Sequence, residues 1–261
     1  MSGLTMMDSL PNEILDAVLD FLPTPSLLPM ALVCHRFRTA VTETLRLRLL
    51  QTADLDGHEI EVECYHPIAK MTTPTLMCQP GSVAVVGSAP SPWDECWGLC
   101  HAGQVYSRFV PEDAWVTQEV ALDEGELFSQ LCASAAVVRP GPRRGLYRSH
   151  TAVGDGVIRV WRKWLATRAA AAADSETNQP IEEDSILWAD YRKNMGVRVG
   201  VSRGELEHAP LSMADDEPAV EYTLHYKEVL VRTSRVLLAM ERSAAREGAQ
   251  RGKAVIITSS Y

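Results

Sequence analysis

The sequence lacks the features that place a chain in a membrane or on nucleic acid. It has no apolar run that approaches the ~18–20 residues a helix needs to cross a bilayer. Its 34 acidic residues outnumber its 25 basic residues, which gives a net charge of −9. This balance leaves no positive surplus for phosphates or for an anionic membrane surface. We therefore expect neither nucleic acid nor a membrane as a partner.

The marks of secretion are missing as well. The opening residues, MSGLTMMDSLPNE, carry no basic region ahead of an apolar stretch, so they do not read as a signal peptide. The chain has no Asn-x-Ser/Thr acceptor for glycosylation, and its six cysteines are not arranged as a disulfide framework. We expect an intracellular protein with reduced thiols, in the cytoplasm, the nucleus or both.

The motifs of common enzyme classes are also absent. We find no G-x-S-x-G, no Walker A sequence and no H-E-x-x-H, and the glycines at 154–156 and 196–200 lack the order of a phosphate-binding loop. His225 could be paired with Ser234 or Cys132 as a nucleophilic set, but a structural histidine is the simpler interpretation. The sequence predicts no catalytic residue, no cofactor and a non-enzymatic protein.

One cluster has metal-type ligands. Cys96, Cys100 and His101 form a C-x3-C-H pattern, whereas zinc needs four ligands and no second ligand pair at matching spacing is evident. We favour a buried thiol pair and predict no metal site. A hydrolase or metal site around this cluster remains the less favoured alternative.

Against these absences stands a stretch rich in apolar residues, from Leu10 to Val41. Pro11 suits the first turn of a helix, and Pro23 ends it. A second helix is expected from Pro25 or Ser26, with Pro29 in its first turn. A third is expected from about Cys34 to Leu50. The apolar positions recur at helical spacing, at Ile14, Leu15, Val18, Leu19 and Leu22 in the first helix, Leu27, Leu28, Ala31 and Leu32 in the second, and Phe37, Val41 and Leu45 in the third.

The three helices are short for the apolar surface they carry. Isolated helices below ~12–15 residues are marginal in water, and a unit of about 40 residues usually needs a partner, a metal or disulfides. Only Cys34 lies within this stretch, so disulfides cannot supply that support. We infer that part of the apolar surface serves another protein.

The order of these residues resembles the F-box family. The matching elements are Leu10-Pro11-x-Glu13-Ile14-Leu15, Val18-Leu19-x-Phe21-Leu22-Pro23, Leu27-Leu28, Ala31-x-Val33-Cys34 and Phe37. This resemblance implies docking on the Skp adaptor, and through it on a cullin. The adaptor-binding residues it implies are Leu10, Pro11, Ile14, Leu15, Leu27, Leu28, Val33, Cys34 and Phe37.

The remaining chain predicts a mainly β body. Short strand-like segments alternate with proline–glycine turns, which favours a sandwich or a barrel. A short helix is expected at 127–136, a turn at Gly154–Gly156, a strand at 157–165 and a late helix at 235–247. The fold class is thus α+β: a three-helix domain at 8–50, then a β-rich domain at 51–261 with a flexible insertion near 166–184.

The body would read the target. All six tryptophans lie in it, and two or three exposed on one face would make a recognition surface for a peptide or a sugar. A β-rich, tryptophan-bearing body after an F-box is similar to plant phloem-lectin F-box proteins, and the Tyr-Thr-Leu-x-Tyr segment at 222–226 resembles fungal F-box proteins. We therefore expect the substrate-recognition subunit of a cullin–RING ubiquitin ligase, which binds an unknown target protein or its glycan. The alternative is an adaptor-binding protein that acts outside a ligase.

Overall fold

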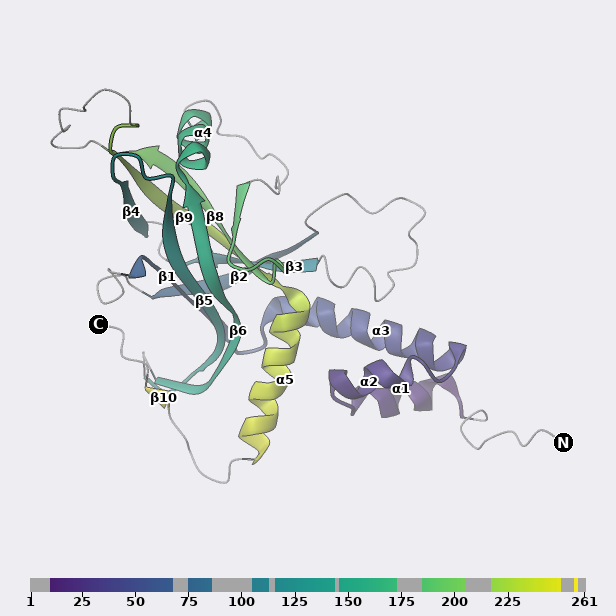
Figure 1. The fold of residues 1–261 in the computed structure, drawn as a ribbon. Coiled ribbons are helices and arrows are strands. Elements are labelled where there is room, and N and C mark those ends of the chain that lie inside the picture. Colours follow the sequence, from purple (N-terminus) through teal and green to yellow (C-terminus); the bar gives the residue numbers. More distant parts are fainter. Residues whose placement is uncertain are drawn as a thin grey trace.

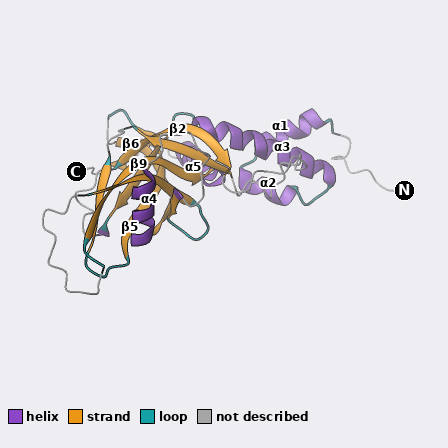
Figure 2. Cartoon of the chain, turned by 90° about the horizontal axis from the view of Figure 1, so that it is seen from above, coloured by secondary structure: helices purple, strands orange, loops and turns teal. Residues whose placement is uncertain are grey.

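The computed structural model describes residues 10–67, 75–85, 105–112, 116–143, 146–172, 185–204, 217–249 and 256–257. Three N-terminal helices project from a strongly curved β-sheet, and a late helix stands between the two (Figures 1 and 2). We call residues 12–51 the helical unit and the β-rich part the body. The predicted α+β class is confirmed, and of the two predicted architectures the body has the barrel-like one.

The helical unit consists of α1 (Asn12–Asp20), α2 (Thr24–Met30) and α3 (His35–Gln51). Two prolines lie at the limits of α1 as predicted, because Pro11 is the N-cap of α1 and Pro23, which follows α1, is the N-cap of α2. The position predicted for Pro29 is wrong. Because α2 already begins at Thr24, Pro29 is its sixth residue, and the helix ends one residue later. The missing N–H of proline favours such an early end.

Ten strands in the described part of the chain make one antiparallel sheet in the order β10-β6-β5-β1-β2-β3-β9-β8-β7, and β4 pairs with β9 alongside β3. The strands are β1 (Glu59–Tyr65), β2 (Leu76–Val85), β3 (Val105–Pro111), β4 (Thr117–Leu122), β5 (Phe128–Pro140), β6 (Leu146–Trp161), β7 (Ile186–Trp188), β8 (Met195–Arg203), β9 (Val220–Arg232) and β10 (Ile256–Ile257). A short 3-10 turn, η1 (Thr52–Asp54), leads from α3 into β1.

The sheet curls until its two ends nearly meet, and two glycines of β6 make this possible. A Cβ at Gly156 would lie 2.1 Å from the carbonyl oxygen of Ala189, and one at Gly154 would lie 3.0 Å from the Cβ of Met195. The turn predicted at Gly154–Gly156 is therefore wrong. These glycines sit inside a long strand, where they permit the close approach of another segment.

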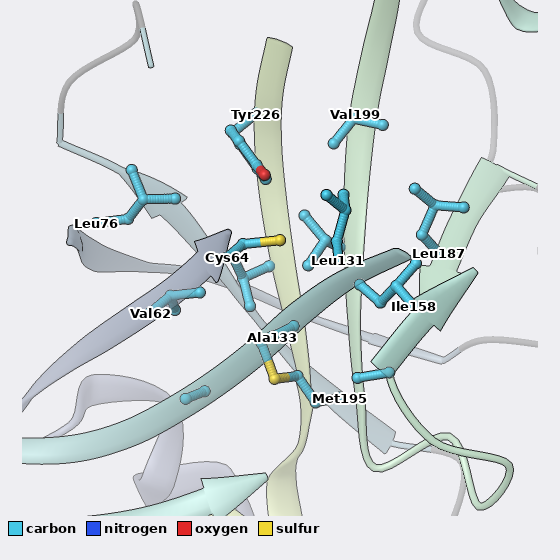
Figure 3. Packing of buried hydrophobic residues seen from close by; sticks show 14 of the residues in the cluster. Val62, Cys64, Leu76, Leu131, Ala133, Ile158, Leu187, Met195, Val199 and Tyr226 are labelled. Atoms are coloured by element: carbon cyan, nitrogen blue, oxygen red, sulfur yellow. The ribbon is translucent and has the colours of Figure 1, made fainter. Parts of the chain in front are cut away.

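The concave side of the sheet holds the main core. Alternate residues of each strand point inward, among them Leu131, Ile158, Met195 and Val199, and they pack against one another in Figure 3. Tyr226 lies in this core and donates a hydrogen bond from its hydroxyl to Gln118 at 2.5 Å. A buried hydroxyl that has a hydrogen-bond partner costs little free energy, so a tyrosine side chain can fill part of this interior.

The helix predicted at 127–136 is wrong, because residues 128–136 belong to β5. Alanine and leucine favour a helix in isolation, but β5 pairs along its length with both β1 and β6. Its buried residues, including Leu131, Ala133 and Ala135, alternate with less buried ones. Pairing on both sides thus overrides local propensity.

The strand predicted at 157–165 is right only as far as Trp161, where β6 ends and α4 (Arg162–Ala172) begins. Arg162 fixes this change, because its guanidinium donates to the carbonyl oxygens of Glu126, Pro218 and Asp123 at 2.6–2.8 Å. The first residues of the insertion predicted at 166–184 therefore lie in α4, and residues 173–184 lie outside the described part of the chain.

The late helix, α5 (Thr233–Ala249), follows directly from β9, close to the position predicted. Its buried side chains Val236 and Ala239 belong to the core of the body, and the helix packs along β6. It also contacts α3 and η1, so it touches both parts of the molecule (Figure 1). The position of α5 thus joins the helical unit to the body.

Candidate functional site

The helical unit has its own small core. Leu15, Leu19, Leu27, Val41 and Leu45 are buried in it, with contributions from all three helices. This core uses only part of the apolar residues of α1 and α2. The rest of their apolar surface remains on the outside.

The start of α1 is tied to the start of α3. Arg36 donates from Nε to Oδ1 of Asn12 at 2.9 Å, and its guanidinium also bonds the carbonyl oxygen of Leu10. The Leu10–Asn12 segment therefore lies beside the segment where α2 passes into α3. That segment includes Val33 and Cys34, both of which are exposed.

Two stripes of exposed apolar side chains result, and together we call them the apolar surface of the helical unit. On α1 the stripe runs along Ile14, Val18 and Phe21, at spacings of four and three residues. Phe21 at the end of α1 is 89% exposed, and Leu32 just after α2 is 87% exposed. Side chains of this kind are seldom left in water together unless a partner covers them. The second stripe runs along Leu28, Leu32 and Val33.

The residues predicted to bind the adaptor fall into three groups. Leu15 and Leu27 are buried in the core of the helical unit, so they could support an interface only through the packing of the helices. Leu10 and Phe37 are half-buried. The exposed members are Pro11, Ile14, Leu28, Val33 and Cys34. As a set of contacts, the nine residues remain a prediction.

Sequence reasoning left three residues of the apolar surface out. Val18, Phe21 and Leu32 extend the two stripes, and all are at least half exposed. For Val18 and Phe21, the signal that could have found them is the breadth of the apolar face of α1, since a short helix packed on two others cannot bury residues around so wide an arc.

A polar junction fixes the helical unit to α5. Glu241 of α5 accepts from the backbone N–H of Thr24 at 3.0 Å and from its hydroxyl at 2.7 Å. It also pairs with Arg48 of α3 at 3.1 Å. Arg48 in turn donates to the carbonyl oxygens of Leu19 and Asp20, at the end of α1. The Glu241 carboxylate of α5 thus binds the start of α2, while its partner Arg48 binds the end of α1.

Two further contacts of α5 strengthen its attachment. His58 lies 3.1 Å from the hydroxyl of Ser243, and that hydroxyl also contacts the hydroxyl of Ser149 in β6. Arg139 of β5 forms an ion pair with Glu247 near the end of α5. The orientation of the helical unit on the body is thereby set by several directed contacts rather than by a single hinge.

The shifted pKa values in the body arise from burial in the core and from an ion pair between strands. Burial raises the pKa of Cys64 to about 11 and that of Cys78 to about 12, so both thiols stay protonated at neutral pH. A hydrogen bond from His150 to Glu61, aided by the charge of this carboxylate, raises the pKa of His150 against the opposing effect of burial. Glu61 is itself buried on the outer side of β1, so its carboxylate is largely shielded from solvent.

Neither of the two candidate chemical sites is assembled within the described residues. His225 contacts Ser202 at 2.8 Å in an exposed position, and no contact joins it to Ser234 or Cys132 there. The cluster of Cys96, Cys100 and His101 lies outside the described part of the chain, as do Trp93, Trp97 and Trp115. Among the residues that the structure does describe, no group of three or more His, Cys, Asp or Glu could hold a metal ion, and no helix is long and apolar enough to span a membrane.

Comparison with known proteins gives one match. Residues 7–51 match the family model described as F-box-like, which covers the helical unit and little beyond it. No curated protein and no solved structure shows a significant match to the chain.

Proposed function

We propose that the helical unit docks on the Skp adaptor of a cullin–RING ubiquitin ligase. This proposal is supported by the F-box-like domain at residues 7–51, which makes this chain an F-box protein. In this proposal the body binds a target protein and presents it to the ligase. The proposal also places the protein in the cytoplasm or the nucleus, where these machines act.

The observation that carries this proposal is the apolar surface of the helical unit. Phe21, Leu28, Leu32 and Val33 are all about half exposed or more, on a unit whose own core is complete without them. A standard protein–protein interface buries ~1,600 Å² in total and has an apolar centre. Such a centre suits a helical adaptor, and the F-box-like match makes the Skp adaptor the first one to test.

The mechanism is proximity rather than side-chain chemistry. A target held on the body is tethered near the ubiquitin-charged enzyme, so its effective concentration there rises. Several contacts of α5 fix the body on the helical unit, which favours a defined direction for the tethered target. In this proposal no residue of the chain acts as a catalyst.

Co-purification with the Skp adaptor tests the proposal. The wild-type chain is expected to elute with the adaptor as one complex, whereas Phe21→Asp combined with Leu32→Asp, and separately Leu10→Ala combined with Pro11→Ala, should not. Val110→Asp, which adds a charge at an exposed apolar position on β3, should leave the complex intact. Unchanged binding by both double variants would sink the proposal, provided that circular dichroism shows them folded.

Two alternatives have their own tests. A role outside a ligase predicts that the chain binds the adaptor but that the pair does not recruit a cullin when one is added. A metal or hydrolase site around Cys96–His101 predicts stoichiometric zinc in the purified protein, with its loss in Cys100→Ser. The metal or hydrolase site ranks below the ligase role, because the apolar surface and the family match concern adaptor binding. The role outside a ligase shares these observations, so cullin recruitment alone separates it from the ligase role.

A further inference from the structure

A second apolar surface lies on the body, at the open end of the β5–β6 hairpin. It consists of Leu127, Phe128, Val157, Arg159 and Trp161, and we call it the hairpin patch. Phe128 lies directly opposite Trp161 in the antiparallel register, and Gln130 lies opposite Arg159. The intervening residues Ile158, Val160 and Leu131 point into the core, so the patch residues of the two strands share the outer face of the sheet.

The patch is exposed and already ordered. Leu127 is 61% exposed, Val157 52% and Trp161 47%. The rings of Phe128 and Trp161 meet in a tilted pair with centroids 5.1 Å apart. The guanidinium of Arg159 lies over the Phe128 ring, 5.5 Å from its centroid. Aromatic and arginine side chains that are held in place before binding are the types that carry most of the energy in interfaces.

Exposed apolar side chains of the described body are concentrated in the hairpin patch. Six large apolar residues of the described body are exposed, namely Val83, Val110, Leu127, Val157, Trp161 and Tyr191. Three of the six fall in the hairpin patch, and the other three are spread over β2, β3 and the segment after β7. Scattered apolar residues on a surface need no partner, but a contiguous group with ordered rings indicates an interface.

The location of the patch suits a bridging protein. Trp161 immediately precedes α4, which lies at the end of the body remote from α1, α2 and α3 (Figures 1 and 2). The contacts of α5 with α3 and η1 are made at the other end. A molecule bound at the patch would therefore not obstruct an adaptor bound at the helical unit.

The charge at the patch indicates what kind of segment fits it. Within the described residues the guanidinium of Arg159 makes no hydrogen bond or ion pair, and it lies over the face of the Phe128 ring. The edge donors of this guanidinium are therefore available, and they match a carboxylate in a two-bond arrangement. Lys163, exposed in the first turn of α4, adds a second positive charge close by in the chain.

We infer that the hairpin patch is the target-reading surface of the body, and that it binds a peptide segment in which an apolar side chain stands next to an Asp or Glu. The apolar side chain packs against Trp161 and Phe128, while the carboxylate pairs with Arg159. This inference rests on the proposed function, because it names the surface and the chemistry by which the target is held.

Short fluorescein-labelled peptides test it, with the full chain in complex with its adaptor and fluorescence anisotropy as the measurement. The probe alternates Leu or Phe with Glu in a glycine–serine frame. One matched peptide replaces each Glu by Lys, and another replaces each apolar residue by Ser. The first peptide is expected to bind, and each replacement should weaken binding by at least about tenfold.

The chain supplies matched control variants. Arg159→Gln and Trp161→Ala should each weaken binding of the acidic peptide by about tenfold or more. Tyr191 and Arg192 form a similar exposed ring–guanidinium pair, 5.4 Å apart, in the segment between β7 and β8 and outside the hairpin patch. Tyr191→Ala and Arg192→Gln should therefore leave peptide binding unchanged.

Two results would overturn the inference: no binding of the acidic peptide by wild type, or binding that is indifferent to Arg159→Gln and Trp161→Ala. Adaptor binding is measured in the same samples by co-elution. Loss of peptide binding with intact co-elution concerns the hairpin patch, whereas failure of the wild-type chain to co-elute concerns the proposed function. The two failures are thus distinguished in one experiment.

Discussion

Replacing Glu241 by alanine should loosen the helical unit from the body. The carboxylate accepts from the Thr24 N–H, from the Thr24 hydroxyl and from Arg48, at 3.0, 2.7 and 3.1 Å. After the change, the N–H and the hydroxyl of the buried Thr24 lose their acceptor, and the hydroxyl keeps only the hydrogen bond that it accepts from Arg48 at 3.1 Å. Arg48 keeps the carbonyl oxygens of Leu19 and Asp20, so it is not left entirely unpaired.

The magnitude follows from these contacts. A hydrogen bond to a charged group contributes about 1.5–3 kcal/mol, but three bonds to one carboxylate do not add. The side chains of Arg48 and Glu241 are 14% and 24% exposed, so solvent screening lowers the contribution of the ion pair but does not remove it. We expect a loss of about 2–3 kcal/mol in the free energy that holds α1 and α2 in place.

Hydrogen exchange followed by mass spectrometry measures this loss locally. Amides in α1 and α2 should exchange about 30–150-fold faster in Glu241→Ala than in wild type, since each 1.4 kcal/mol corresponds to a factor of about ten. Amides in β5 and β9 should keep their wild-type rates. Glu241→Gln, which keeps an acceptor and removes the charge, should fall between the two.

A matched control is the exposed pair of Glu43 and Arg46 on α3, which meet at 2.6 Å with both side chains well exposed to solvent. Glu43→Ala should leave exchange in α1 and α2 unchanged, because exposed pairs contribute little. The reasoning would be refuted if Glu241→Ala had no effect on α1 and α2. It would equally be refuted if exchange rose by the same factor throughout the body, since the junction would then have no local role.

Three other predictions concern the body and the helical unit. Gly156→Ala should destabilise the body by about 2–3 kcal/mol or more in urea unfolding, because its Cβ would meet a carbonyl oxygen at 2.1 Å, whereas Gly248→Ala in α5, with open space around it, should be neutral or slightly stabilising. The ion pair of His150 raises the folded pKa of this residue, so the stability advantage of wild type over His150→Gln should be full below about pH 6.5 and should fall as the pH rises through the folded value; equal advantages at low and high pH would contradict it. Iodoacetamide near neutral pH should modify the exposed Cys34, with protection when the adaptor is bound, and should leave the buried Cys64 unmodified in the folded protein, as peptide mapping can show.

The sequence predicted best where local chemistry decides the structure. Pro11 and Pro23 mark the limits of α1 because proline acts on its own neighbours. The late helix α5 was predicted from its periodicity. Prediction failed where distant pairing decides, as in β5, whose alanine-rich residues become a strand through β1 and β6. Gly154 and Gly156 were taken for a turn because their partners, Met195 and Ala189, are remote in sequence.

The candidate site shows the same division. Periodicity identified the helices of the helical unit but could not say which side of each helix faces its own core. Leu15 and Leu27 consequently joined the predicted contacts although both are buried, while Phe21 and Leu32 were left out although both are highly exposed. The role of Glu241 could not be predicted at all, because its partners lie about two hundred residues earlier.

The contact between Thr24 and Glu241 spans 217 residues, so it joins one of the first helices to be synthesised to the last one. At ~5–20 residues per second, about 10–40 s pass between the appearance of the two partners at the ribosome. During that interval the apolar surface of the helical unit is already present, but nothing yet holds it to a body. An adaptor that binds the nascent chain in this window would shield that surface before α5 arrives. The junction can form only after β1 to β9, which all precede α5 in the chain, have been synthesised.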